Sequence, residues 1–171
     1  MALFINSFNF MIQNEDATQA HAIVSDSPPG AFAISGINSA AFPVQYAAIA
    51  ALPQNERGPA VENFYQTVFW NKWLEQITSD AVAMRVFDAA VNMGPIISVK
   101  LLQEAINTLI LPTIIVDGVL GTHTISATNL CEPALLVTAF QNTRCAHYEA
   151  IVAKNPADEK YLNAWIVRAK K

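Results

Sequence analysis

Asp88 and Asn92 are spaced four residues apart in the segment FDAAVNMGP, residues 87–95. Side chains at this spacing lie next to each other on one face of a helix. The apolar residues at 87, 90 and 91 fall on another face, at the spacing of a buried stripe. A carboxylate and an amide held together beside a buried stripe could form the wall of a polar cleft. Helix capping or solvation of the same two side chains is the alternative.

The elements that must hold these side chains are mostly helices, so the sequence predicts a mainly α fold with a small β element. Gly94 and Pro95 predict the end of one helix and the start of the next. A β-branched run at 108–115 predicts a small hairpin arm before a turn at 117–118. Helical patterns cover residues 8–14, 40–52, 61–74, 79–92, 96–107, 132–154 and 158–170, with an extended passage at 32–37 and a turn-rich loop at 25–30.

Composition excludes several classes of protein. The chain is 53% hydrophobic and 14% charged, which predicts a packed core rather than disorder. Ten Lys and Arg residues and a net charge of −4 predict no nucleic-acid-binding surface. Cys131 and Cys145 are expected to be reduced, because several helical turns would separate them. Neither these cysteines nor the three histidines form a metal-ligand pattern, so we predict no metal and no other cofactor.

Segment 87–95 resembles the F-D-x-A-V-N-x-G-P motif of the phage-type N-acetylmuramidase family, which is followed there by a helix containing Leu-Gln. This family, glycoside hydrolase family 108, comprises lysozyme-like endolysins once described as secretion activator proteins. The resemblance runs from about Phe64 to Arg168. Besides segment 87–95 it rests on the aromatic pairs 64–65 and 69–70, on Leu102-Gln103, on DGVLGTHT at 117–124, and on Arg144, Tyr148, Asn155-Pro156, Trp165 and Arg168.

The resemblance implies a lysozyme-like single domain. Residues 1–107 would form the muramidase region. Residues 108–171 would form a C-terminal, helical, peptidoglycan-binding-like region packed on it.

The resemblance also implies two catalytic residues. The family's acid is a Glu at the end of the first helix, in an E-G-G-Y context, and Glu15 matches its position, with Asp and Ala in place of the two glycines. The family's next motif, D-P-G-G-x-T-x-x-G-I, aligns with residues 29–37, where Ala33 replaces the Thr. Asp26 lies near the position of the family's Asp and could assist the water or the cationic intermediate. Glycoside hydrolysis uses such a pair of carboxyl groups.

Further side chains are predicted to contact the substrate. Ser35, or the nearby Ser27, could position the attacking water in place of the missing Thr hydroxyl. Tyr65 and Trp70 belong to the aromatic motif and could stack on sugar rings, although core packing is the alternative for Trp70. Asp88 and Asn92 could bind sugar, with hydrogen bonds between packed helices as the alternative.

Two functions remain open from the sequence. The first is a peptidoglycan hydrolase, an N-acetylmuramidase that cleaves the β-1,4 bond between N-acetylmuramic acid and N-acetylglucosamine. The second is a degenerate, catalytically weak or inactive relative that acts as a binding or structural component. Loss of the glycine and threonine positions favours the second function, and retention of Glu15 favours the first. In both cases the expected partner is the peptidoglycan glycan strand.

The expected location follows from the N-terminal residues and from the apolar runs. Residues 1–8 lack the basic segment and long apolar core of a standard signal peptide. The apolar run 109–116 is short and is interrupted by Pro112, so no membrane span is predicted. We therefore expect synthesis in the cytoplasm, and action in the periplasm or cell wall after delivery by a holin or a secretion system.

Overall fold

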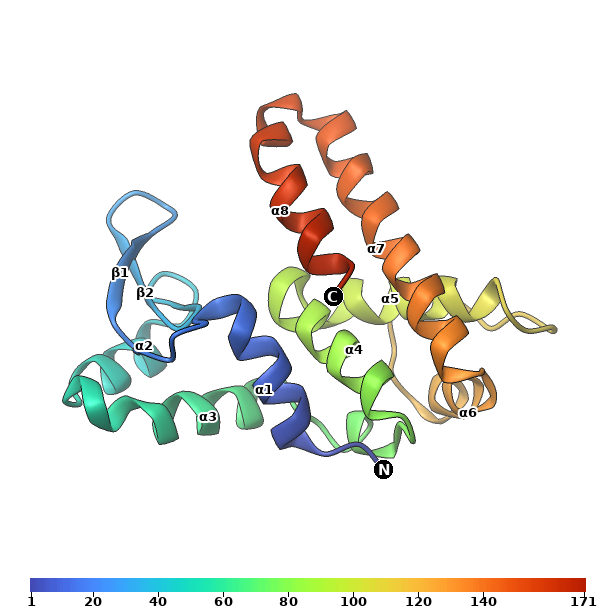
Figure 1. Ribbon diagram of the computed structural model, residues 1–171, viewed down its shortest axis with the longest axis horizontal. Coiled ribbons are helices and arrows are strands. Elements are labelled where there is room, and N and C mark those ends of the chain that lie inside the picture. The colour runs from blue at the N-terminus through green and yellow to red at the C-terminus, as the bar shows by residue number, and fades with distance from the viewer. The chain divides into compact units, whose positions relative to one another are not determined.

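The computed structural model describes residues 1–171, and its helices confirm the predicted mainly α fold (Figure 1). The helices are α1 (Phe4–Glu15), α2 (Pro43–Ala50), α3 (Arg57–Val68), α4 (Asp80–Met93), α5 (Pro95–Asn107), α6 (Thr122–Leu130), α7 (Pro133–Lys154) and α8 (Glu159–Ala169). The strands are β1 (Ile23–Asp26), β2 (Ala31–Ile34) and β3 (Ile37–Asn38), which form one antiparallel sheet in the order β1-β2-β3. Short 3-10 turns lie at Gln54–Glu56, Leu74–Gln76 and Pro156–Asp158.

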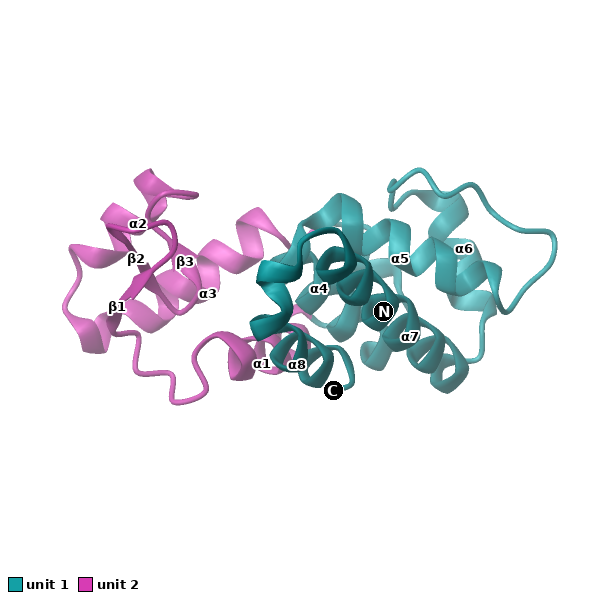
Figure 2. Cartoon of the chain, turned by 90° about the horizontal axis from the view of Figure 1, so that it is seen from above, with its two compact units in different colours: residues 1–3, 72–171 teal, residues 4–71 magenta.

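The chain divides into two compact units (Figure 2). The N-terminal unit, residues 4–71, contains α1, the sheet, α2 and α3. The C-terminal unit, residues 72–171 together with residues 1–3, contains α4 to α8. The sequence predicts a boundary after residue 107, between a muramidase region and a peptidoglycan-binding-like region, whereas the chain passes between the compact units at residues 71–72. The functional boundary stays a prediction.

The core of the N-terminal unit joins α1 to α3. Phe8, Met11 and Ile12 are buried on one side of α1, at the spacing that a helix needs to present a single face. Phe64 and Tyr65 of α3 are buried as well, and the rings of Phe8 and Tyr65 lie 6.1 Å apart. This packing fixes the C-terminal end of α1 beside the sheet, where the candidate acid lies.

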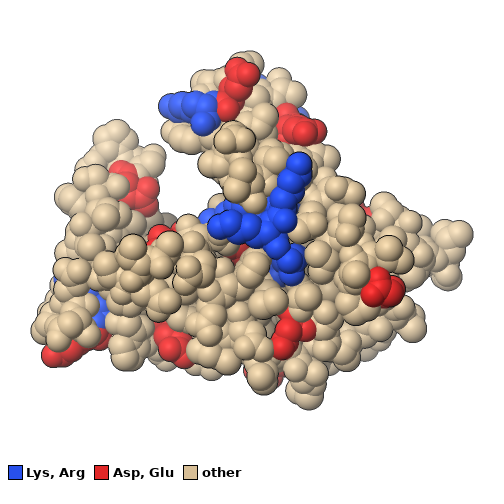
Figure 3. All heavy atoms as spheres, viewed as in Figure 1, with Lys and Arg blue, Asp and Glu red and all other residues tan.

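The C-terminal unit follows the predicted helix boundaries at its centre. Gly94 ends α4 with a φ of 91°, a conformation that favours glycine, and Pro95 begins α5. The Glu132 carboxylate accepts hydrogen bonds from two backbone N–H groups at the start of α7. On the face drawn in Figure 3, Lys and Arg side chains gather near the C-terminal end of α8, whereas acidic side chains are scattered.

One local prediction was wrong, and one helix was not predicted. Residues 108–121 form an irregular loop without strands, so the predicted hairpin arm is absent. Pro112 cannot donate to a strand ladder, and the side chain of Asn107 holds the backbone of Ile114 instead. The helix α6 was not predicted, because Thr is frequent in it and Thr favours strands over helices. No helix in the structure combines the length and the hydrophobicity that crossing a bilayer requires.

Candidate functional site

The predicted acid, Glu15, is the last residue of α1. Its side chain is half-buried, and its carboxyl group lies against the backbone of Gly36. A β-carbon at position 36 would lie only 2.5 Å from Glu15 Oε2 and 2.8 Å from the Tyr65 hydroxyl. Gly36 is itself exposed, and the absence of a side chain there leaves room for the Glu15 carboxyl group.

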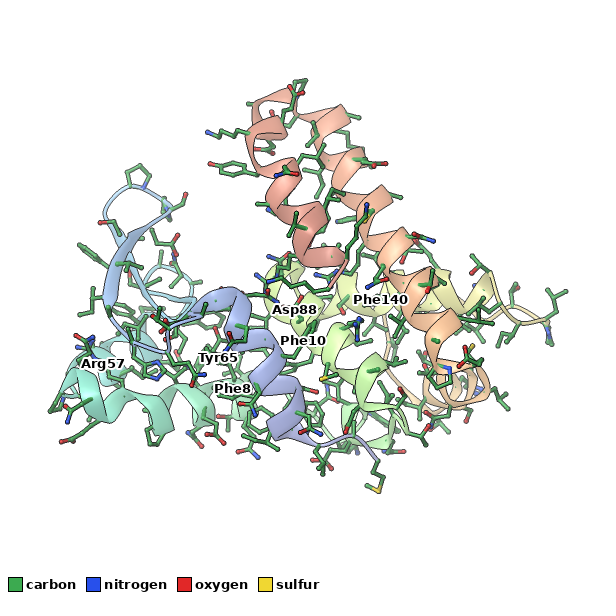
Figure 4. All side chains as sticks on the ribbon, in the orientation of Figure 1. Phe8, Phe10, Arg57, Tyr65, Asp88 and Phe140 are labelled. Carbon is green, nitrogen blue, oxygen red and sulfur yellow. The ribbon has the colours of Figure 1, made fainter.

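Gly36 belongs to the tight turn that joins β2 to β3. Ile34 and Ile37 pair across this turn, and the two central residues, Ser35 and Gly36, have φ values of 48° and 83°. Positive φ at both central residues is the signature of a type I′ hairpin turn. The Tyr65 hydroxyl donates a 2.7 Å hydrogen bond to the Ser35 carbonyl oxygen, so α3 holds the turn in place (Figure 4). Tyr65 thus fixes the backbone against which Glu15 packs.

The neighbouring carboxylate, Asp16, organises a polar cluster with Ser35 and His21. The Ser35 hydroxyl donates to Asp16 Oδ2 at 2.8 Å, and it lies 2.8 Å from His21 Nδ1. His21 Nδ1 is 3.5 Å from the same Asp16 oxygen. Since the hydroxyl proton of Ser35 points to Asp16, the imidazole N–H of His21 donates to the hydroxyl oxygen. Ser35 is 5% exposed and its hydroxyl donates to a carboxylate, whereas the hydroxyl of a nucleophilic serine donates to an imidazole nitrogen.

The Asp16 carboxylate also closes the loop that follows α1. It accepts hydrogen bonds from the backbone N–H groups of Ala20 and His21, at 3.2 and 2.8 Å. Burial raises the pKa of the Asp16 carboxyl group, but bonds from two backbone N–H groups and two hydroxyls outweigh burial and hold the pKa below its ordinary value of 3.8. Asp16 is therefore an ionised structural centre next to the candidate acid.

Backbone strain is concentrated around this cluster. Gln19, His21 and Ser35 all have φ near 50°, a conformation that residues other than glycine adopt rarely. Arg57, which is buried, donates to the carbonyl oxygen of His21 at 2.9 Å and so supports the strained loop from α3 (Figure 4). Strained residues that surrounding contacts hold in place are typical of functional sites.

A polar pocket of about 540 Å³ opens beside the cluster. Its lining includes the ring of His21 and the amide side chains of Gln19, Gln54 and Asn55. Gln54 also donates to the carbonyl oxygen of Ala20, at 2.8 Å. Amide side chains of this kind can donate to and accept from the hydroxyl and acetamido groups of a sugar.

The second predicted catalytic residue, Asp26, lies at the other end of the β1–β2 hairpin. Its pairing partner is Ala31, whereas Ile34, which precedes the turn near Glu15, pairs with Ile23. Three residue steps along a strand correspond to about 10 Å. The Asp26 carboxylate accepts from Asn38 Nδ2 at 2.7 Å, and its side chain is exposed. The strand register therefore separates Asp26 from the turn that carries the Glu15 contact.

The two aromatic residues of the predicted site are buried. Tyr65 is 1% exposed and Trp70 is 8% exposed. The ring of Trp70 packs edge-on against Phe4, with 5.7 Å between the ring centres. Core packing, the alternative interpretation for Trp70, agrees with this environment, and Tyr65 acts on the site through its hydroxyl group.

Asp88 of α4, labelled in Figure 4, is completely buried, and its carboxylate contacts two arginines. Arg144 Nη2 is 3.0 Å from Asp88 Oδ2, and Arg168 Nη2 is 2.8 Å from Oδ1. Sequence reasoning predicted a sugar contact here. A carboxylate with no exposed surface and two arginine partners holds α4, α7 and α8 together instead, so we assign Asp88 a structural role.

Asn92, one turn later on α4, is half-buried and accepts a hydrogen bond from the Tyr148 hydroxyl of α7. Burial raises the pKa of Tyr148, so its hydroxyl keeps its proton. The ring of Tyr148 stacks on Trp165 of α8 at 5.3 Å. A role of Asn92 in sugar binding stays a prediction, and its observed partner belongs to the helix packing.

The cysteines and the other ligand-type residues form no metal centre. Cys131 and Cys145 are both free, as predicted, and burial raises the pKa of the Cys131 thiol. No group of three or more His, Cys, Asp or Glu side chains is arranged to hold a metal ion.

Sequence reasoning identified Glu15, Ser35 and Tyr65 but not the cluster that joins Ser35 to His21. The only hint in the sequence was the pair of adjacent acids at 15–16. Nothing in the spacing of His21 indicated that a strained loop would return it to Asp16 and Ser35.

Comparison with known proteins gives a family match for the C-terminal part of the chain and a structural match for nearly all of it. Residues 97–170 match the family model described as "Predicted Peptidoglycan domain". No curated protein matches the chain. Among solved structures, SagA of Brucella abortus is similar over 97% of this chain and 92% of its own, with a TM-score of 0.64 and 21% sequence identity. The chain thus shares the fold of SagA, and its residues 97–170 carry the pattern of a predicted peptidoglycan domain.

Proposed function

We propose that this protein is a peptidoglycan glycosidase, an N-acetylmuramidase in which Glu15 is the general acid. The observation that carries the proposal is the position of the Glu15 carboxyl group against the exposed Gly36, at the end of a helix anchored in the core. The match of residues 97–170 to a predicted peptidoglycan domain supplies the substrate class.

In the proposed reaction Glu15 gives its proton to the glycosidic oxygen, and the bond from that oxygen to the anomeric carbon breaks. A water molecule attacks the anomeric carbon and loses a proton to a base. Asp26 is the proposed base, as the sequence predicts. The strand register places Asp26 three residue steps, about 10 Å along the strand, from Ile23, which pairs with Ile34 beside the turn.

Ser35 contributes indirectly in this proposal. Its hydroxyl is engaged by Asp16 and His21, so it positions the turn that carries Gly36 rather than the water. The amide side chains of Gln19, Gln54 and Asn55 provide hydrogen-bonding groups for a sugar in the pocket beside His21.

The second candidate function is a peptidoglycan-binding protein without hydrolytic activity. Ala33, where the resembled family has Thr, favours it, because an alanine methyl group cannot orient a water molecule. In this case residues 97–170 would still attach the protein to the wall.

The test measures the release of new reducing ends from isolated peptidoglycan by purified protein. Glu15→Gln keeps the shape of the side chain but cannot donate the proton, so the rate is expected to fall by about a hundredfold or more. Glu56→Gln is the matched control, since it removes an exposed acid from the same unit. Equal activity of wild type and Glu15→Gln would exclude Glu15 as the acid. Absence of any release by wild type, with retained sedimentation on peptidoglycan, would favour the binding protein.

A further inference from the structure

A second pocket, of about 320 Å³, lies in the C-terminal unit near the start of α6. Its lining combines the apolar side chains of Ile114 and Ile115 with the polar side chains of Thr113, Asp117 and His123. The pocket lies within the residues that match the predicted peptidoglycan domain. Nothing in the proposed cleavage by Glu15 uses it.

The floor of this pocket is built around Gln103 of α5, which is 1% exposed. Its Nε2 donates to Asp117 Oδ1 at 2.8 Å and to the Thr124 hydroxyl at 3.0 Å. Its Oε1 accepts from the backbone N–H of Gly118 at 2.9 Å. The side chain of one buried glutamine therefore fixes both the DG turn and the start of α6.

The apolar wall is fixed in a similar way. Asn107 Nδ2 donates to the carbonyl oxygen of Ile114, and Asn107 Oδ1 accepts from the Ile114 N–H, both at 2.8 Å. Ile115, the next residue, is 81% exposed. An irregular loop that is anchored at one residue and keeps an apolar side chain in water presents a preformed surface to a ligand.

Asp117 is the charged group of the pocket. Its side chain is exposed, and its Oδ1 accepts hydrogen bonds from Gln103 and from the N–H of Val119, which hold the carboxylate in place. The bond from Gln103 is the largest of the influences that hold the pKa of Asp117 below its ordinary value, and Lys100 is the smallest. The pocket thus presents an ionised, oriented carboxylate next to an aliphatic surface.

We propose that this pocket binds the free end of the diamino acid in a peptidoglycan stem peptide. Its ammonium group would bind the Asp117 carboxylate, its carbon chain would lie on Ile114 and Ile115, and its carboxylate would face Thr113 and His123. The proposal rests on the proposed function in that peptidoglycan is the substrate. It adds that the C-terminal unit recognises the peptide and not the glycan.

The negative charge of Asp117 favours the stem peptide of peptidoglycan over its glycan. The amino groups of its sugars are acetylated, so the glycan offers no cation to a carboxylate. A free diamino acid terminus offers an ammonium group, and its bond to an ionised carboxylate is about twice as strong as a neutral hydrogen bond. The aliphatic chain between the two ends of a diamino acid also matches an isoleucine wall better than a sugar hydroxyl does.

The test titrates the full chain with free meso-diaminopimelate and, separately, with a tri-N-acetylglucosamine glycan, using calorimetry and amide chemical shifts. Diaminopimelate is expected to bind and to shift the amides of residues 113–124, and the glycan is expected to leave them unchanged. Acetylation of the amino groups of diaminopimelate should weaken binding by about tenfold or more, since one charge-assisted bond is lost.

Asp117→Asn is the matched variant, because its Oδ1 can still accept from Gln103 while the charge is removed. It should weaken diaminopimelate binding by a similar factor, whereas Glu104→Gln, an exposed acid of the same unit outside the pocket, should leave it unchanged. Equal binding of free and acetylated diaminopimelate, or binding of the glycan alone to residues 113–124, would overturn the proposal. Cleavage of peptide-free glycan strands tests Glu15 separately, and Asp117→Asn should not change it.

Discussion

Asp88 in the C-terminal unit and Asp16 in the N-terminal unit are both centres of polar networks, in opposite environments. Asp88 has no exposed surface, and its partners are the two cations Arg144 and Arg168. Asp16 keeps 14% of its side-chain surface exposed, and its partners are backbone N–H groups and hydroxyls. The Asp88 network holds helices α4, α7 and α8 together, and the Asp16 network holds a strained loop beside the Glu15 carboxyl group.

This difference indicates which carboxyl groups a substrate could reach. Asp88 belongs to the most recognisable segment of the sequence, residues 87–95, yet its bonds from Arg144 and Arg168 join three packed helices. Glu15 and Asp16 belong to a segment that departs from the resembled family, yet the half-buried Glu15 side chain lies against the exposed Gly36. The strongest sequence motif of this chain therefore reflects helix packing. The candidate site is identified instead by the exposure of its side chains and the strain of its backbone.

The largest expected effect comes from removing the buried carboxylate. Asp88→Ala leaves the buried guanidinium group of Arg144 and the partly buried one of Arg168 without their anion, and breaking a buried ion pair in this way costs about 3–5 kcal/mol. Asp16→Ala breaks half-exposed hydrogen bonds and should cost about 1 kcal/mol. Urea denaturation followed by circular dichroism measures both. If the two variants unfolded at the same urea concentration, the contrast between a closed and an open network would be wrong.

A smaller effect on stability, but a specific one on activity, is expected at the turn. Gly36→Ala and Gly30→Ala both place a side chain at a φ near 85–90°, since the two residues have φ values of 83° and 89°. Each should lose about 1 kcal/mol of stability. Only the β-carbon at position 36 would collide with Glu15, because nothing lies within 4 Å of the equivalent position at Gly30.

Glycan release should therefore fall by about tenfold or more in Gly36→Ala, since small displacements of a catalytic group have effects of this size. It should stay near the wild-type rate in Gly30→Ala. Comparable losses in both variants would mean that hairpin stability, and not the position of Glu15, controls the rate.

Much of the fold followed from local signals. Gly94 and Pro95 separated α4 from α5 as expected, and the long pattern at 132–154 corresponds to α7, which begins at Pro133. The hairpin arm at 108–115 failed because the side chain of Asn107, outside the run, bonds both backbone groups of Ile114. Periodicity reports which residues favour a strand, but it contains no information on a competing partner elsewhere in the chain.

The candidate site was predictable only in part. The position of Glu15 at the end of a helix could be read from the sequence, because α1 has a regular apolar face. The cluster of Asp16, His21 and Ser35 could not, because it depends on positive φ at residues that rarely adopt it. Contacts of this kind become visible only when the chain has folded back on itself.

The smallest expected effect is the response of the Asp16 network to acid. The folded state holds the pKa of Asp16 below the ordinary value of 3.8. A lowered pKa means that the ionised form stabilises the fold, that this stabilisation is complete above pH 3.8, and that it is lost as the pH falls through the folded-state value. In Asp16→Asn the side chain has one acceptor oxygen and cannot accept the bonds from both the backbone N–H groups and the hydroxyls. The variant should therefore be less stable than wild type at neutral pH.

As the pH falls below 3.8, the wild-type carboxylate takes up a proton and loses the same bonds, so the difference in unfolding free energy between wild type and Asp16→Asn should shrink. Urea titrations at a series of pH values measure this difference, and Glu56→Gln, an exposed acid of the same unit, controls for general charge removal. A difference that stayed constant into strong acid would mean that the Asp16 network does not depend on its charge. The loop beside Glu15 would then be held by backbone contacts such as the one from Arg57 to His21.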